Sequence, residues 1–228
     1  MRTRFQAVIF DMDGLLLDSE AIAFAAFRET CGHFALGDQT HVFMRCIGTN
    51  AEAGERVLEE GLRGRADHLA FNRLWQENYL RTVTRAPIPL KPGVTELLAA
   101  LQAASVPLAV ATSTRSDRAR QKLRDAGIDS AFQAIVGGDQ VARSKPHPDI
   151  YLKAADDLRA RPGECLALED SENGVRAALG AGMTVIQIPD LVEPSPELRA
   201  LGHAVLQSLH DVYDHVFGNR PLPGGGAS

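Results

Sequence analysis

Two aspartates lie close together after a short apolar segment near the start of the chain. Residues 5–10 read FQAVIF, and Asp11, Asp13 and Gly14 follow them. Side chains at positions i and i+2 of an extended chain point the same way, so both carboxylates can reach one substrate. One can attack as a nucleophile while the other gives or takes a proton. Gly14 permits a sharp turn that lifts Asp13 over the site.

Further polar residues that could take part in such chemistry stand at three places later in the chain. The Thr112 hydroxyl and the backbone N–H groups from Ser113 onward could hold phosphate oxygens. Lys145 precedes an expected helix, where a fixed cation could neutralise both a phosphate and the attacking carboxylate. Glu169 and Asp170 follow another apolar segment. Carboxylates that converge on one place repel each other, and oxygen ligands without nearby His or Cys favour Mg²⁺.

The elements that must position these residues alternate between strand and helix. Strands are expected at 5–10, 106–111, 134–136, 165–168 and 184–188, and helices at 95–104, 117–126, 147–158 and 173–181. This alternation predicts an α/β fold with a doubly wound parallel sheet. Ligands bind beyond the carboxyl ends of the strands in such sheets, so the polar residues should meet at one edge.

A mainly helical segment separates the first strand from the others. Helical patterns cover 21–31, 51–61 and 67–83. We therefore predict a core formed by 1–17 and 88–220, an inserted helical domain at 18–87 and a disordered tail at 221–228. Weaker signals within the core suggest a strand at 204–206 and a helix at 208–217.

Each polar motif also has an ordinary structural explanation. An Asp-Gly pair such as 13–14 is a common turn, and Thr112 or the segment 169–171 could cap the helix that follows. Lys145 alone would be read as a surface lysine. The functional interpretation is favoured because all of these motifs coincide with strand ends or helix starts.

Composition narrows the class of protein. The net charge of −5 over 228 residues argues against nucleic-acid binding. The three cysteines, Cys31, Cys46 and Cys165, are too few and too widely spaced for a disulfide framework or a zinc site. No segment approaches the roughly 18 apolar residues that span a bilayer. We expect a cytoplasmic enzyme that is a monomer and binds neither membranes nor nucleic acids.

The motifs together resemble those of the haloacid dehalogenase superfamily, in its branch of beta-phosphoglucomutase-like phosphatases. They read DMDGLLLDSE, VATST, SKPHPDIY and LEDSENG, and the resemblance covers nearly the whole chain except the tail. It implies an α/β core with a helical cap that closes over the site and selects substrates.

The resemblance also implies roles for individual residues. Asp11 would be the nucleophile that forms an aspartyl-phosphate, and Asp13 the general acid and base. Thr112 would bind the transferring phosphoryl group, with Ser113 beside it, and Lys145 would link the phosphate to the nucleophile.

The resemblance implies Mg²⁺ as the cofactor. Asp170 would be a ligand beside Asp11, with Glu169 near the ion directly or through water, and the backbone carbonyl of Asp13 would be a further ligand. Arg45 and Arg115 are candidates for binding an anionic leaving group. Arg115 is the better candidate because it follows the Thr112 loop, and the alternative for both is a surface role.

Hydrolysis and mutase chemistry remain as alternatives within this branch. The mutases carry a histidine, an arginine and a lysine in the cap, where this chain has Ala23, Ala51 and Trp75. Residues 19–86 contain no lysine, which argues against imine-forming phosphonoacetaldehyde hydrolases, and Asp13 argues against dehalogenase chemistry. We expect a magnesium-dependent phosphatase of a small phosphorylated metabolite, with a phosphosugar mutase as the alternative. A non-catalytic sensor would be expected to have a damaged motif, and none is damaged.

Overall fold

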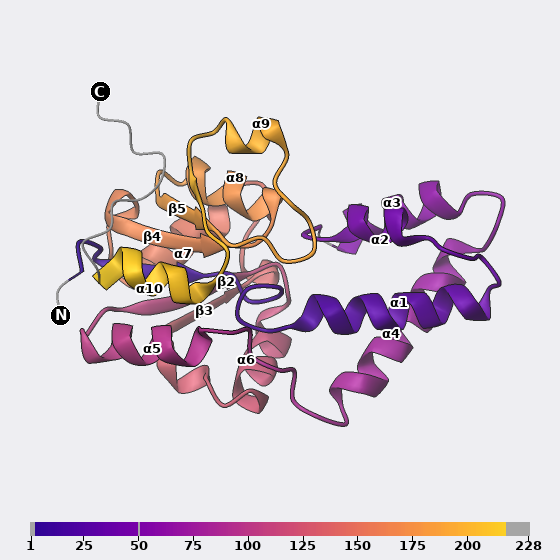
Figure 1. Cartoon of the computed structure of the whole chain (residues 1–228), viewed down its shortest axis with the longest axis horizontal. Helices are drawn as coiled ribbons and strands as arrows, with labels where there is room; N and C mark the ends of the chain where they lie inside the picture. Colours follow the sequence, from indigo (N-terminus) through magenta and orange to yellow (C-terminus); the bar gives the residue numbers. More distant parts are fainter. Residues whose placement is uncertain (1–2, 50, 218–228) are drawn as a thin grey trace.

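A six-stranded parallel sheet forms the centre of the computed structural model, which describes residues 3–49 and 51–217 (Figure 1). The spatial order is β3-β2-β1-β4-β5-β6, and all neighbouring strands run parallel. The strands are β1 (Ala7–Phe10), β2 (Leu108–Thr112), β3 (Ala134–Gly137), β4 (Cys165–Glu169), β5 (Thr184–Gln187) and β6 (Ala204–Val205). The predicted α/β fold with a doubly wound parallel sheet is confirmed.

Helices cover both faces of this sheet. One face packs against α5 (Val94–Ala103), α6 (Ser116–Asp125) and α10 (Leu209–Phe217), and the other against α7 (Asp149–Asp157), α8 (Glu172–Gly180) and α9 (Pro196–Arg199). Three 3-10 turns lie between these elements, at Asp129–Ala131, Gly138–Gln140 and Pro162–Glu164. Along β1, Val8 and Phe10 enter one hydrophobic cluster while Ala7 and Ile9 enter the other. Burial on both faces explains why the strands read as continuous apolar runs.

Residues after β1 form a separate group of helices at one end of the molecule (Figure 1). These are α1 (Ser19–His33), α2 (Thr40–Cys46), α3 (Ala51–Leu62) and α4 (His68–Val83). They have a hydrophobic cluster of their own, centred on Phe27, Phe43 and Phe71. We call this group the helical domain. No helix was predicted at α2, because its seven residues are too few to give a clear helical period.

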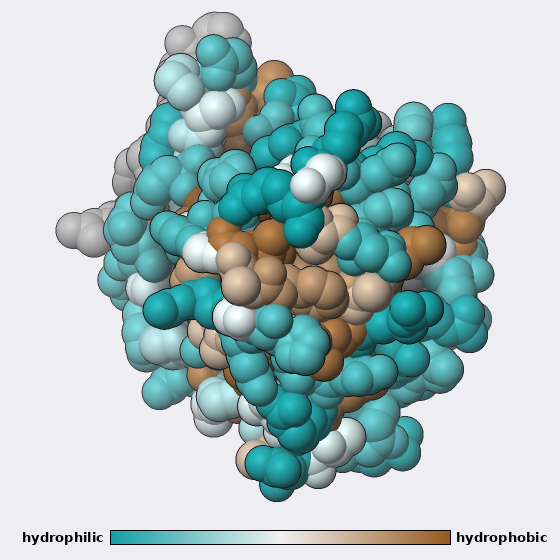
Figure 2. All heavy atoms as spheres, turned by 90° about the vertical axis from the view of Figure 1, so that its right-hand side faces the viewer, coloured by the Kyte–Doolittle hydropathy of each residue, from teal (hydrophilic) through white to brown (hydrophobic). Residues whose placement is uncertain are grey.

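The outer end of the helical domain has a mixed surface. Figure 2 shows this end of the molecule, where hydrophobic side chains gather in the middle of a largely hydrophilic face. Several hydrophobic residues that pack against the cluster are only partly buried, as expected for a small domain with a thin core. Within the described part of the chain, no helix combines the length and apolarity needed to cross a membrane.

Two chain segments that lie side by side connect the helical domain to the sheet. Leu17 and Leu90 form an antiparallel bridge, and the Asp18 N–H donates to the Pro89 carbonyl at 2.8 Å. The chain thus leaves and returns at one place, which is the arrangement that an insertion requires. The predicted tail at 221–228 lies outside the described residues.

Candidate active site

The carboxyl ends of β1 and β4 bring the first acidic residues together. Phe10 pairs with Leu168 in the parallel register, and the Asp11 N–H donates to the Leu168 carbonyl at 2.9 Å. Asp11 therefore lies beside Glu169, the last residue of β4. This placement follows from strand order and register alone.

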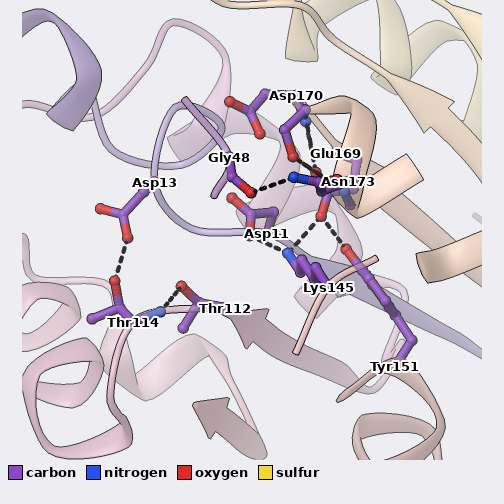
Figure 3. A network of polar contacts seen from close by, with 12 residues as sticks. Asp11, Asp13, Gly48, Thr112, Thr114, Lys145, Tyr151, Glu169, Asp170 and Asn173 are labelled. Carbon is purple, nitrogen blue, oxygen red and sulfur yellow. Dashed lines mark hydrogen bonds and ion pairs between the residues drawn. The ribbon is translucent and has the colours of Figure 1, made fainter. Parts of the chain in front are cut away.

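Lys145 links these two carboxylates from the loop before α7. Its Nζ lies 2.5 Å from Asp11 Oδ1 and 2.6 Å from Glu169 Oε1 (Figure 3). Tyr151 donates its hydroxyl to Glu169 Oε1 at 2.5 Å. Burial alone would lower the pKa of Lys145, but the Asp11 and Glu169 carboxylates raise it above its ordinary value. Lys145 is therefore a buried, permanently charged cation and not a surface lysine.

Three buried carboxylates form a group that suits a metal ion. Asp11, Glu169 and Asp170 each offer an oxygen, and these atoms all lie within 4.8 Å of one another. Burial raises the pKa of Asp11 to about 8, with Lys145 opposing the shift and Glu169 adding to it. Burial, then the Asp11 and Glu169 charges, raise the pKa of Asp170 well above its usual value.

The raised pKa values of Asp11 and Asp170 mean that their charged forms are unfavourable without a further cation. This observation tests whether the site suits the expected cofactor. A single lysine does not balance three buried carboxylates, and a divalent cation would relieve the remaining repulsion. The donors are all oxygen atoms, as Mg²⁺ prefers. The residues present therefore fit Mg²⁺.

Asp13 stands apart from this group and has partners of its own. Its side chain points away from Asp11 and toward Thr114 (Figure 3). Thr114 donates its hydroxyl to Asp13 Oδ2 at 2.7 Å, and Lys122 Nζ lies 2.8 Å from Asp13 Oδ1. Burial would raise the pKa of Asp13, but Lys122 and the two hydrogen bonds lower it below its ordinary value. The role of the Asp13 carbonyl as a metal ligand stays a prediction.

The expected phosphate-binding residues follow β2. Thr112 is buried, and its hydroxyl accepts the Thr114 N–H at 3.1 Å. Thr112 and Ser113 line the same cavity as Asp11 and Lys145. Arg115 is not brought to this cavity, since its side chain is 65% exposed and pairs with Asp117 at 3.4 Å.

A cavity of about 910 Å³ separates the sheet edge from the helical domain. Its core side is polar and includes Asp11, Asp13, Thr112, Lys145 and Asp170. Its other side is mixed: it includes the apolar residues Ala23, Phe43, Ile47, Ala51 and Trp75, and also polar side chains such as Glu20, Gln76 and Arg85. The Trp75 indole N–H donates to the Ala23 carbonyl at 2.9 Å, so its only donor is already used. Arg45 pairs with Glu60 and does not line the cavity.

The helical domain closely approaches the core at Gly48. Asn173 Nδ2 donates to the Gly48 carbonyl at 3.0 Å (Figure 3). Gly48 has a φ of +69°, and a Cβ there would lie only 2.8 Å from Ser171 Cβ. Only glycine fits this contact without displacement, so Gly48 allows the helical domain to sit directly above the acidic group.

Sequence reasoning missed several charged residues that line the cavity: Glu20, Arg85, Arg118, Lys122 and Asp125. Lys122 was expected only as part of a helix, and nothing in its spacing pointed to Asp13. Glu20 lies in the first turn of α1, where burial, followed by the Asp13 and Asp190 charges, raises its pKa to about 7. The only signal for Glu20 was its position at the end of the first quoted motif.

Comparison with known proteins gives a consistent answer. A model of haloacid dehalogenase-like hydrolases matches residues 8–188. The phosphorylated carbohydrates phosphatase of Thermotoga maritima is 34% identical over 178 residues, which cover 78% of this chain and 82% of the relative.

Two solved structures are also similar. A HAD family hydrolase from Deinococcus radiodurans R1, with bound phosphate and sodium, has a TM-score of 0.76 and 31% identity, and the match covers 93% of this chain and 95% of the other. CbbY from Rhodobacter sphaeroides, in complex with xylulose-(1,5)bisphosphate, has a TM-score of 0.71 and 32% identity over 90% of this chain and 95% of the other. The chain therefore belongs to the haloacid dehalogenase-like hydrolases and is a phosphatase of that family.

Proposed function

We propose that the protein is a magnesium-dependent phosphatase that hydrolyses a small phosphorylated carbohydrate through a phosphorylated Asp11. The observation that carries the proposal is the position of Lys145, buried between Asp11 and Glu169 at the floor of the cavity. A fixed cation beside a nucleophilic carboxylate is suited to hold a phosphate dianion in line for attack. The carbohydrate is inferred from the relative in Thermotoga maritima, which is named for that substrate class.

The first half of the reaction transfers the phosphoryl group to the protein. An Asp11 oxygen attacks phosphorus while the ester P–O bond breaks, and the departing oxygen takes a proton from Asp13. Thr112 and the following N–H groups hold the phosphoryl oxygens. In this role Asp13 has to turn toward the cavity and away from Thr114 and Lys122, whose contacts lower its pKa, so that it can carry the proton.

The second half returns the protein to its starting state. Asp13 takes a proton from water, the water oxygen attacks phosphorus, and the bond to Asp11 breaks, which restores the carboxylate and releases phosphate. Asp11 and Asp170, with Glu169 nearby, would hold Mg²⁺. When bound, the ion neutralises the phosphate charge that would otherwise be repelled by these carboxylates.

Hydrolysis is favoured over the mutase reaction by the wall opposite the acidic group. Ala23, Ala51 and Trp75 occupy the cap positions where the mutase relatives are expected to carry polar groups, and all three line the cavity. At these three positions no side chain is free to bind a phosphorylated sugar while it is reoriented, since the alanines carry no polar group and the Trp75 N–H already donates to Ala23. Incubation with β-glucose 1-phosphate separates the two reactions, since hydrolysis releases phosphate and a mutase forms glucose 6-phosphate.

The nucleophile is tested by an Asp11→Asn variant. We expect kcat for phosphate release from sugar phosphates to fall by at least about a thousandfold, because no covalent intermediate can form. Asp157→Asn is the matched control, since Asp157 is a surface residue paired with Lys153. Equal rates for Asp11→Asn and the wild type would refute the mechanism.

A further inference from the structure

A chain of buried hydrogen bonds reaches the acidic group from the neighbouring strand β5 and from the residue before β6. Gln187 ends β5 beside Glu169 in the parallel register and is 1% exposed. Its Nε2 donates to the backbone carbonyl of Asp170 at 3.0 Å. His203 Nε2 lies 2.8 Å from Gln187 Oε1. None of the proposed catalytic steps uses either side chain.

The chemistry of these groups fixes the direction of every bond in the chain. The Asp170 carbonyl can only accept, so the Gln187 amide must present its NH₂ there and its oxygen to His203. His203 must therefore carry its proton on Nε2. Its Nδ1 is then a bare acceptor, in agreement with the lack of a hydrogen-bond partner for this buried atom among the described residues.

Hydrogen bonds hold the backbone of Asp170 at both its N–H and its carbonyl. The Asp170 N–H donates to Glu169 Oε2 at 3.1 Å, and its carbonyl accepts from Gln187. The Asp170 carboxylate itself makes no hydrogen bond with any residue that the structure describes, although it is 6% exposed. Its direction is therefore set through its backbone and by contact with Gly14, where a Cβ would lie 2.2 Å from Asp170 Oδ2.

We propose that Gln187 is a positioning residue that aims Asp170 at the metal, and that His203 holds Gln187 in the required orientation. The inference rests on the proposed metal site, because aiming matters only if Asp170 is a ligand. Loss of a residue that hydrogen-bonds to a metal ligand and fixes its orientation commonly weakens metal affinity 10- to 100-fold. Without the Gln187 amide, the buried Asp170 carbonyl would lack a hydrogen-bond donor. The peptide group would then rotate toward a different donor, and this rotation would move the Asp170 carboxylate.

Calorimetric titration of the metal-free full chain with Mg²⁺ tests this directly. We expect Gln187→Met, which keeps the length of the side chain but removes the amide, to weaken the Kd by about tenfold. His203→Leu should weaken it by a smaller factor. His203→Gln should stay near the wild type, because a glutamine Nε2 can replace the lost donor.

A matched control separates aiming from general stability. Gln133 Oε1 accepts the Leu108 N–H at 2.6 Å, at the opposite edge of the sheet. Gln133→Met removes a comparable bond and should leave the Kd unchanged, whatever it does to the melting temperature. If Gln187→Met does not fold, His203→Leu and its rescue by His203→Gln carry the test.

Two negative results have different meanings. Wild-type affinity in Gln187→Met and His203→Leu would overturn this inference and leave the proposed function intact. A wild-type protein that binds no Mg²⁺ would overturn both.

Discussion

Replacement of Lys145 by methionine should reveal how strongly the acidic group depends on one cation. Lys145 is 5% exposed and pairs with Asp11 at 2.5 Å and Glu169 at 2.6 Å. Lys145→Met keeps much of the side-chain volume and leaves both carboxylates buried without their partner. Such a loss commonly destabilises a fold by about 3–5 kcal/mol. For a chain of this size, that corresponds to a melting temperature lower by roughly 6–20 °C.

The loss of stability in Lys145→Met should depend on pH, and the pKa of Asp11 sets the direction of that dependence. Burial raises its pKa from 3.8 to about 8, with Lys145 opposing the rise, so the variant should have a still higher value. Between the unfolded and folded pKa, the native state binds more protons, and stability therefore falls as pH rises. The wild-type native state releases this proton near pH 8, whereas the variant keeps it to higher pH. The difference in stability between Lys145→Met and the wild type should therefore be larger at pH 9.5 than at pH 6.5.

Urea unfolding without divalent metal is the appropriate assay, repeated with Mg²⁺. The ion should recover part of the loss, because it supplies positive charge to the same carboxylates. Lys153→Met is the control, since Lys153 forms a half-exposed pair with Asp157 and should cost no more than about 0.5 kcal/mol. A loss of stability for Lys145→Met at pH 9.5 that is as small as the loss for the Lys153→Met control would refute the electrostatic reasoning.

Three other perturbations test separate parts of the site. Gly174→Ala should abolish Mg²⁺ binding and lower the melting temperature, because a Cβ there would lie 1.9 Å from the Glu169 carboxyl carbon. Lys122→Met should lose stability at neutral pH in urea unfolding, and the difference from the wild type should disappear as pH falls below the ordinary pKa of Asp13, because Lys122 lowers that pKa. Cys46 should resist iodoacetamide at pH 8 in mass-spectrometric labelling until the protein is unfolded, because burial raises its pKa to about 12.

Each of these three predictions would be contradicted by a specific result. Gly163→Ala is the control for the glycine substitution, since its Cβ would meet nothing closer than 3.9 Å, and equal behaviour of the two variants would contradict the steric argument. A Lys122→Met deficit that persists unchanged at low pH would show that the Asp13 pair is not its cause. Rapid labelling of folded Cys46, which is half-buried and lines the cavity, would contradict the raised pKa of its thiol.

The sequence was sufficient for the parts of the site that depend on strand order. Asp11 and Glu169 each follow an apolar run, and parallel pairing of the two strands brings them together. The family resemblance and the doubly wound fold were also correct, because every motif fell at a strand end or helix start.

Other contacts depend on rotation and packing that a pattern does not encode. Lys122 reaches Asp13 only because of how α6 is turned against the sheet, and its spacing in the sequence resembles that of any exposed helical lysine. Arg115 was a candidate for binding an anionic leaving group, but its side chain is exposed and pairs with Asp117. Gln187 and His203 meet across neighbouring strands, and neither residue type at such a position is a sign of a metal site.

The central claim is that phosphate passes through Asp11, and chemical trapping tests it most directly. Protein quenched during turnover of a sugar phosphate and treated with tritiated borohydride should carry the label at residue 11, because borohydride reduces an acyl phosphate to the alcohol. Peptide mapping would locate the label, and enzyme without substrate should remain unlabelled. Turnover that continues with no label at Asp11, or with the label on another carboxylate, would contradict the account.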